Sequence, residues 1–169
     1  DLFDRGLQAS DRDAYNALMK AIGEILEVCP IVAVRGTPSH DVLGCYAPLE
    51  TMRAKHPFVV LEPGMPFMLP GLMVLGIPEP GKSWLLANKN GLGRNEANQA
   101  VVDAMKALLL GLGGLRREHP ELATVLLYHG ILRGATIGTG QTIRPGEIAL
   151  GREDLETVGA DFAILGHIH

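Results

Sequence analysis

The chain has 169 residues, of which 47% are hydrophobic and 20% are charged. This length and composition indicate a single globular domain and exclude a disordered chain. No apolar run reaches the roughly 18 residues of a membrane-spanning helix, so we expect no membrane association. The net charge of −4 excludes a wholly basic nucleic-acid-binding module, although a local basic patch stays compatible with it.

Two further features set the expected context of the chain. Its two cysteines, Cys29 and Cys45, provide no disulfide framework, so we expect a reducing, cytoplasmic environment. The sequence begins with Asp1 instead of Met, and it ends in an apolar run at His169. We therefore expect both ends to be cut from a longer protein.

The apolar residues follow helical and strand periodicities in alternation. Helical segments have apolar side chains on one face, and the strands are short apolar runs between Pro and Gly residues. This pattern predicts an α/β domain over residues 1–169 with buried strands and helix-covered sheet faces. In chain order we predict a helix over residues 11–28, a strand over 31–34, a helix over 42–55, strands over 58–61 and 72–77, a helix over 95–118, a strand over 124–128, a helix over 152–158 and a strand over 161–165.

Four of the six histidines directly follow predicted strands. Because ligands of α/β sheets bind outside the carboxyl ends of strands, these imidazoles are predicted to gather at one edge. The other two, His56 and His119, lie beside Pro in polar turns and are interpreted as ordinary solvated residues. The four strand-end histidines are His40, His129, His167 and His169.

Among these histidines, the pair His167 and His169 most strongly indicates a metal site. In an extended segment residues i and i+2 point the same way, so both imidazoles would face one point. Such a pair suits Zn, Mn, Fe or Ni, and carboxylates would complete a harder site. Asp41, and Asp1 if a strand precedes it, would supply those carboxylates.

Four motifs in one order resemble those of calcineurin-like metallophosphoesterases. Residues 1–6 (DLFDRG) resemble the end of the G-D-x-x-D-R-G motif, and residues 36–41 (GTPSHD) resemble a variant of G-N-H-[DE]. His129 after an apolar strand and the closing residues 166–169 (GHIH) complete the order. The start DLFDR, residues 126–130 (LLYHG) and residues 160–169 (ADFAILGHIH) are closest to SbcD-type DNA-repair exonucleases.

The resemblance implies a four-layer αββα sandwich, here truncated at both ends, and a centre of two divalent metal ions. It implies that Asp1 bridges the two ions, that His129 and His167 bind one of them, and that His169 binds the other. Two ions about 3.5–4 Å apart clamp phosphate oxygens and acidify a water, which phosphodiester hydrolysis requires. Mn(II) is the expected metal.

The resemblance also implies two catalytic residues, a substrate and partners. His40 would contact the scissile phosphate and protonate or stabilise the leaving oxygen, and Asp41 would orient His40. The substrate would be DNA, cleaved as exo- or endonuclease in DNA repair, with an SMC-type ATPase (SbcC-like) as partner and a homodimer as assembly. The alternatives are a calcineurin-like phosphoesterase that acts on a phosphoprotein or a small phosphodiester, and a degenerate metal-binding domain.

The chain departs from the family pattern in two places. The D-x-H motif, which belongs on a strand upstream of Asp1, is absent, as are the strands that would follow His169. In residues 36–41 three residues separate Gly from His, where the family has one Asn that binds metal. The hydroxyl of Thr37 or Ser39, or a water, is the expected replacement for that Asn.

Two glycine motifs are interpreted as structural. Residues 76–83 (GIPEPGKS) match the P-loop pattern, but Pro78 and Pro80 lack the backbone N–H groups that bind phosphate. We therefore predict a strand and a surface loop there, and not a nucleotide site. Residues 111–114 (GLGG) are attributed to a helix end.

Basic residues near the predicted loops are candidates for phosphate contacts with DNA. Ordinary solvated charge is an equally good interpretation of each. Arg133 and Arg144 are favoured because their loop starts directly after His129. The full set is Lys82, Lys89, Arg94, Arg133, Arg144 and Arg152.

Overall fold

The alternation of apolar runs is realised as alternating helices and strands in the computed structural model of the chain, which describes residues 2, 12–42, 44–79, 94–136 and 148–167. Most predicted elements are present within one or two residues of their expected bounds. In chain order the elements are α1 (Arg12–Leu26), β1 (Ile31–Val34), α2 (Ala47–Glu50), β2 (Phe58–Leu61), β3 (Phe67–Leu69), β4 (Leu72–Ile77), α4 (Arg94–Glu118), β5 (Ala123–His129), β6 (Ile131–Leu132), β7 (Ala149–Leu150), α5 (Arg152–Glu156) and β8 (Phe162–Gly166).

The strands form one larger sheet and two strand pairs. The larger sheet has the order β3-β4-β5-β8, in which β4, β5 and β8 are parallel and β3 is antiparallel to β4. β1 pairs with β2, and β6 pairs with β7, both in parallel. The chain is therefore a mixed α/β protein.

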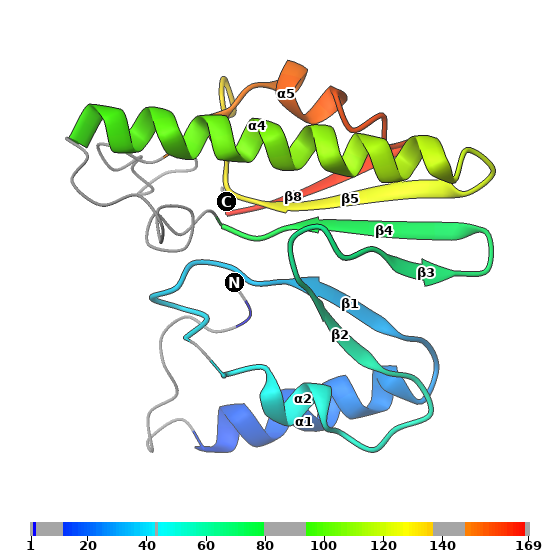
Figure 1. Cartoon of the computed structure of the whole chain (residues 1–169). Coiled ribbons are helices and arrows are strands. Elements are labelled where there is room, and N and C mark those ends of the chain that lie inside the picture. Colours follow the sequence, from blue (N-terminus) through cyan, green and yellow to red (C-terminus); the bar gives the residue numbers. More distant parts are fainter. Residues whose placement is uncertain (1, 3–11, 43, 80–93, 137–147, 168–169) are drawn as a thin grey trace.

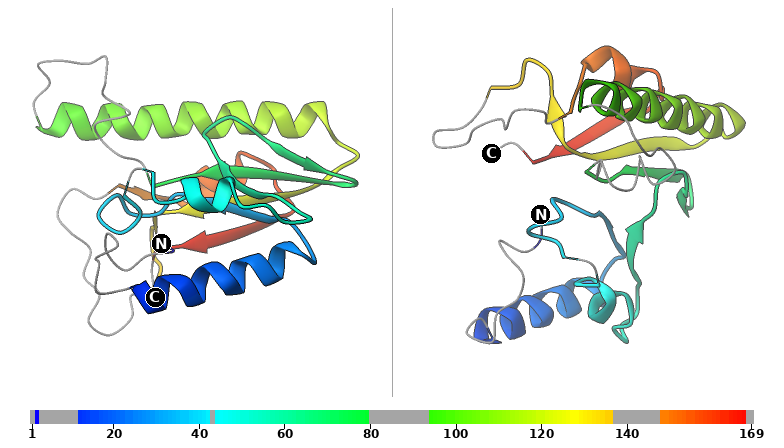
Figure 2. Two further views of the ribbon diagram at one scale, coloured as in Figure 1. Left: turned by 90° about the horizontal axis from the view of Figure 1, so that it is seen from below. Right: turned by 60° about the vertical axis from the view of Figure 1, so that its left-hand side comes forward.

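Helices cover the outer faces of two sheets that face each other (Figures 1 and 2). α4 and α5 lie on one face of the four-stranded sheet, and a buried cluster that includes Met73, Leu126 and Met105 fills the space between them. α1 and α2 lie on the outer side of the β1-β2 pair, over a second cluster that includes Leu26 and Leu49. Each sheet thus has a separate helix-covered core.

The two sheets are in close contact at Gly76 in β4. A Cβ atom built on Gly76 would lie 2.6 Å from Cβ of Leu61 in β2 and 2.7 Å from Cγ1 of Val34 in β1. Only glycine fits such a contact without displacement of a neighbouring side chain. The first glycine of the P-loop-like segment is therefore part of a strand and serves the packing of the sheets.

One predicted helix is much shorter in the structure, and another continues through glycines that were expected to end it. The helix expected over residues 42–55 is reduced to α2. Gly44 has a positive φ of 85°, and Pro48 in the first turn of α2 has no N–H to donate to an earlier carbonyl, so the helix does not extend to residues before Ala47. α4 continues through the glycines that were attributed to a helix end. At Gly113 a Cβ would lie 2.6 Å from the carbonyl oxygen of Thr157, so this glycine permits close packing on the segment after α5. No helix in the described part of the chain is both long and apolar enough to cross a membrane.

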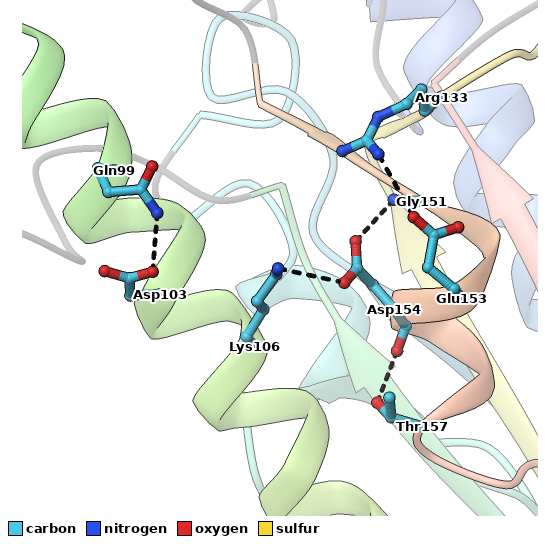
Figure 3. Close-up of polar contacts among 8 residues, drawn as sticks. All are labelled: Gln99, Asp103, Lys106, Arg133, Gly151, Glu153, Asp154 and Thr157. Atoms are coloured by element: carbon cyan, nitrogen blue, oxygen red, sulfur yellow. Dashed lines mark hydrogen bonds and ion pairs between the residues drawn. The ribbon is translucent and has the colours of Figure 1, made fainter.

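A short polar network fixes α5 against α4 (Figure 3). The Asp154 carboxylate accepts a hydrogen bond of 2.8 Å from the Gly151 N–H at the start of α5. Its other oxygen lies 3.7 Å from Nζ of Lys106 on α4. The hydroxyl of Thr157 donates to the Asp154 carbonyl at 2.6 Å and closes the other end of the same turn.

The expectation of buried strands is wrong for β8. All five of its residues are exposed, and the large apolar side chains of Phe162 and Ile164 are 69% and 60% exposed. β8 pairs with β5 along one edge, and within the described residues no strand pairs with its other edge. An apolar strand edge of this kind is a surface to which another strand can add.

The close contact between the sheets predicts opposite effects for two Gly→Ala substitutions. Gly76→Ala should lower the free energy of unfolding by about 1–3 kcal/mol, because the new methyl group overpacks the interface. Gly111→Ala lies on an exposed turn of α4, where a Cβ meets no atom within 4 Å. It should raise stability by about 0.5–1 kcal/mol through helix propensity. Urea unfolding of both variants measures this, and equal effects would contradict the packing role of Gly76.

Candidate metal centre

Three potential metal ligands gather where neighbouring parallel strands end. His129 is the last residue of β5, His167 directly follows β8, and Glu79 lies two residues beyond β4. Because β4, β5 and β8 are parallel neighbours, their carboxyl ends meet at one edge of the sheet. One ligand atom from each of the three side chains lies within 4.8 Å of the other two.

The two histidines stand edge to face, and a hydroxyl from the other sheet lies between them. Their ring centroids are 5.2 Å apart at an interplanar angle of 80°. Oγ1 of Thr37, in the loop after β1, lies 3.5 Å from Nε2 of His129 and 3.4 Å from Nδ1 of His167. Of the two hydroxyls considered as replacements for the family's Asn, the structure thus places that of Thr37 at the histidines, whereas Ser39 is exposed.

The loop over residues 36–41 is held by a buried carboxylate. Asp41 is 4% exposed and accepts hydrogen bonds from the N–H of Gly36 at 2.9 Å and of Leu2 at 3.0 Å. The hydroxyl of Tyr46 also donates to it. This network fixes the backbone of the loop that carries Thr37 and His40.

His40 lies in the same turn as Asp41. The backbone N–H groups of both residues donate to the Thr37 carbonyl at 2.8 Å, and the His40 side chain is half-buried. His40 and Thr37 therefore lie in one hydrogen-bonded turn. The roles assigned to His40 and Asp41 in catalysis stay predictions.

Two of the predicted metal ligands, Asp1 and His169, lie outside the described residues. The prediction that His167 and His169 face one point assumed an extended backbone. That assumption is wrong at His167, because β8 ends at Gly166 and His167 has a φ of 107°. Positive φ is strained for a residue with a side chain, and such strain is concentrated at functional sites.

Glu79 is a site residue that was not predicted from the sequence. It lies inside the P-loop-like segment, which was interpreted as a surface loop. Its position two residues after a buried strand is the same signal that identified the histidines, but it was applied there to histidines alone. The backbone N–H of Glu79 donates to the Arg35 carbonyl at 3.3 Å, which ties the loops after β4 and β1 together.

An apolar groove of about 490 Å³ lies beside the histidines, between β1 and the β5-β8 pair. His129 and Gly166 contribute to its wall at the end near the candidate ligands. The remaining wall is mostly apolar. It includes Leu2, Val32, Val34, Tyr46, Leu127, Ile164 and Leu165.

Two of the basic candidates form ion pairs with acidic neighbours. Nη1 of Arg133 lies 3.3 Å from Oε1 of Glu153, and Nε of Arg152 lies 2.7 Å from Oε1 of Glu156 (Figure 3 shows the first pair). Arg94 begins α4. The other three candidates, Lys82, Lys89 and Arg144, lie outside the described residues.

Neither a scan against protein-family models nor a search of curated proteins finds a match to this chain.

The strained backbone at His167 predicts a difference between two substitutions that both remove the imidazole. His167→Gly should be more stable than His167→Ala by about 1–2 kcal/mol, because glycine adopts positive φ without a Cβ clash. Thermal unfolding of the metal-free proteins measures the difference. Equal stabilities would show that the backbone at this position carries no strain.

The buried tyrosines predict a loss of stability at alkaline pH. Burial raises the pKa of Tyr46, and the hydrogen bond to Asp41 raises it further. Burial also raises the pKa of Tyr128, with contributions from the Glu79 and Asp154 carboxylates. Above pH about 10 the unfolded chain releases these protons while the folded chain retains them, so stability falls by up to about 1.4 kcal/mol per pH unit and tyrosine. The double variant Tyr46→Phe/Tyr128→Phe should flatten this decline in urea titrations between pH 8 and 11, and an unchanged slope would contradict it.

Proposed function

We propose that the chain is the catalytic part of a metal-dependent phosphodiesterase, most closely a DNA nuclease of the SbcD type that uses Mn(II). The observation that carries the proposal is the meeting of His129, His167 and Thr37 at one point. These residues come from three of the family-like motifs. Their arrangement at the carboxyl ends of strands from two facing sheets is what a metallophosphoesterase centre requires.

The layer order supports the same proposal. Helices outside two facing sheets are compatible with the four-layer αββα sandwich that the motifs imply. In this interpretation β1 and its loop belong to one sheet and β5 and β8 to the other. The centre then lies between the sheets, where Gly76 permits their close approach.

The residues present fit a divalent cation. Two imidazole nitrogens and a carboxylate oxygen are ligands that Mn, Fe and Zn accept, and the Oε2 atom of Glu79 is buried without a hydrogen-bond partner among the described residues. When bound, such an ion supplies charge stabilisation to a phosphate and acidifies a water. In our proposal the imidazoles and Thr37 orient that centre, and His40 moves the proton to the leaving oxygen.

The proposal also includes a substrate, two partners and a cellular location. DNA is the proposed substrate, in DNA repair, and an SMC-type ATPase and a second copy of the chain are the proposed partners. The cytoplasm is the proposed location. The metal pair would need Asp1 and His169 in addition to the residues described above.

Hydrolysis assays on the full-length protein test the proposal. With Mn(II) it should degrade linear DNA and hydrolyse bis(4-nitrophenyl) phosphate. His129→Ala should lower both rates at least about 100-fold, since even partners of metal ligands contribute roughly 10–100-fold. Ser39→Ala is the matched control: Ser39 lies two residues from Thr37 but is exposed, so its loss should change the rates less than about threefold.

Other outcomes would assign the chain differently. Hydrolysis of the small ester without degradation of DNA would contradict the nuclease function and favour another phosphodiesterase. Binding of Mn(II) without any hydrolysis would show a metal-binding domain that has lost its activity.

A further inference from the structure

We propose that Glu79 is a metal ligand, and that it completes a three-residue cation site with His129 and His167. This assignment adds a residue that belongs to none of the family-like motifs. It stands on the geometry of the metal site, so it can hold even if the protein hydrolyses no phosphoester.

The distances between the ligand atoms fit one ion. Bonds of about 2.1 Å from an ion to nitrogen and oxygen ligands place those ligands about 3–4.2 Å from one another. The ligand atoms of Glu79, His129 and His167 lie within 4.8 Å of one another. Small rotations of the side chains are therefore enough to bring all three onto one cation.

The Glu79 carboxylate has an unsatisfied oxygen. Oε2 is buried, and within the described residues it has no hydrogen-bond partner. The hydroxyl of nearby Tyr128 donates to the Ile131 carbonyl at 3.2 Å, so this group is engaged elsewhere. A buried carboxylate oxygen without a partner is costly, and a cation held by the two adjacent imidazoles would satisfy it.

The backbone presents Glu79 at a fixed position. Its N–H donates to the Arg35 carbonyl, which links it to the loop after β1. In the sequence Glu79 stands between Pro78 and Pro80, and proline restricts the backbone torsions of its own and the preceding residue. The two prolines that make the segment unsuitable for phosphate binding thus suit it to hold a ligand.

The carboxylate also changes the expected chemistry of the site. Two neutral imidazoles and one carboxylate give a ligand set with one negative charge, which suits Mn, Fe or Zn. The hydroxyl of Thr37, close to both imidazoles, is a neutral and weaker oxygen donor. Glu79 therefore supplies the anionic oxygen that residues 36–41 do not bring to the two imidazoles.

Direct Mn(II) binding tests the assignment without any activity measurement. The full-length protein and its variants would be titrated with Mn(II), and free Mn(II) would be followed by electron paramagnetic resonance. Glu79→Gln keeps the shape of the side chain and removes its charge, so it should weaken the tightest Mn(II) site about 10–100-fold. Glu121→Gln, an exposed position before the amino end of β5, is the matched control and should stay within about twofold of wild type.

The stability of the metal-free proteins separates a ligand from a structural residue. As a ligand, Glu79 is an unsatisfied group without metal, so Glu79→Gln should leave the melting temperature unchanged or raise it. Excess Mn(II) should then stabilise wild type more than Glu79→Gln. Unchanged Mn(II) affinity in Glu79→Gln, alongside a loss in His129→Ala, would overturn the assignment but leave the proposed function intact. A lower melting temperature of metal-free Glu79→Gln would also overturn it, since Glu79 would then stabilise the fold.

Discussion

The close approach of the two sheets at Gly76 is the constraint on which the candidate centre depends. The site draws Thr37 from the loop after β1, in one sheet. It draws His129 and His167 from the carboxyl ends of β5 and β8, which are neighbours in the other sheet. A side chain at position 76 would push β1 and β2 away from β4, since Val34 and Leu61 occupy the space. Contacts of about 3.5 Å between the Thr37 hydroxyl and the imidazoles would not survive such a shift. A packing requirement at the second-last residue of β4 therefore controls the polar geometry just beyond the strand ends.

The buried Asp41 carboxylate holds the loop after β1 in position, as Gly76 sets the distance between the sheets. A charge at this depth is tolerated because two backbone N–H groups and the Tyr46 hydroxyl donate to it. The donors come from residue 2, from the loop itself and from the start of α2. The Asp41 side chain thereby connects three segments of the chain. These contacts fix the position of the turn that carries Thr37 and His40.

Much of the fold could be predicted from the sequence because its strands are short apolar runs with clear Pro and Gly boundaries. The strands over residues 31–34, 58–61 and 72–77 have the predicted bounds, and α4 differs by one residue at its start. β3, β6 and β7 have only two or three residues, too few for a periodicity to show. The helix expected over residues 42–55 does not begin before Ala47, because Gly44 has a positive φ and Pro48 in the first turn of α2 cannot donate to an earlier carbonyl. The exposure of β8 could not be predicted, since the same apolar run occurs in a buried strand and in an edge strand.

The part of the site that could be predicted consists of residues that directly follow strands. Position directly after a predicted strand identified His129 and His167, and the structure brings these two together. The direction of His167 was not predictable, because alternation along a strand does not extend into a residue with positive φ. Glu79 was not predicted, because a single carboxylate between prolines is ordinarily a solvated loop residue. The same two prolines that argued against a phosphate-binding loop are a reason for the carboxylate between them to be rigidly placed.

The chemistry of the ligand atoms explains why a carboxylate from a neighbouring strand is a reasonable partner for this loop. By the resemblance, the loop after β1 would offer an amide carbonyl, and this chain has threonine near the imidazoles instead. A hydroxyl is a poorer donor to a hard divalent cation than a carbonyl or carboxylate oxygen. Two imidazoles and a hydroxyl alone carry no negative charge to offset the ion. Since β4 lies directly beside β5, the first residues beyond β4 are among the few positions from which an anionic oxygen can reach His129, and Glu79 occupies one of them.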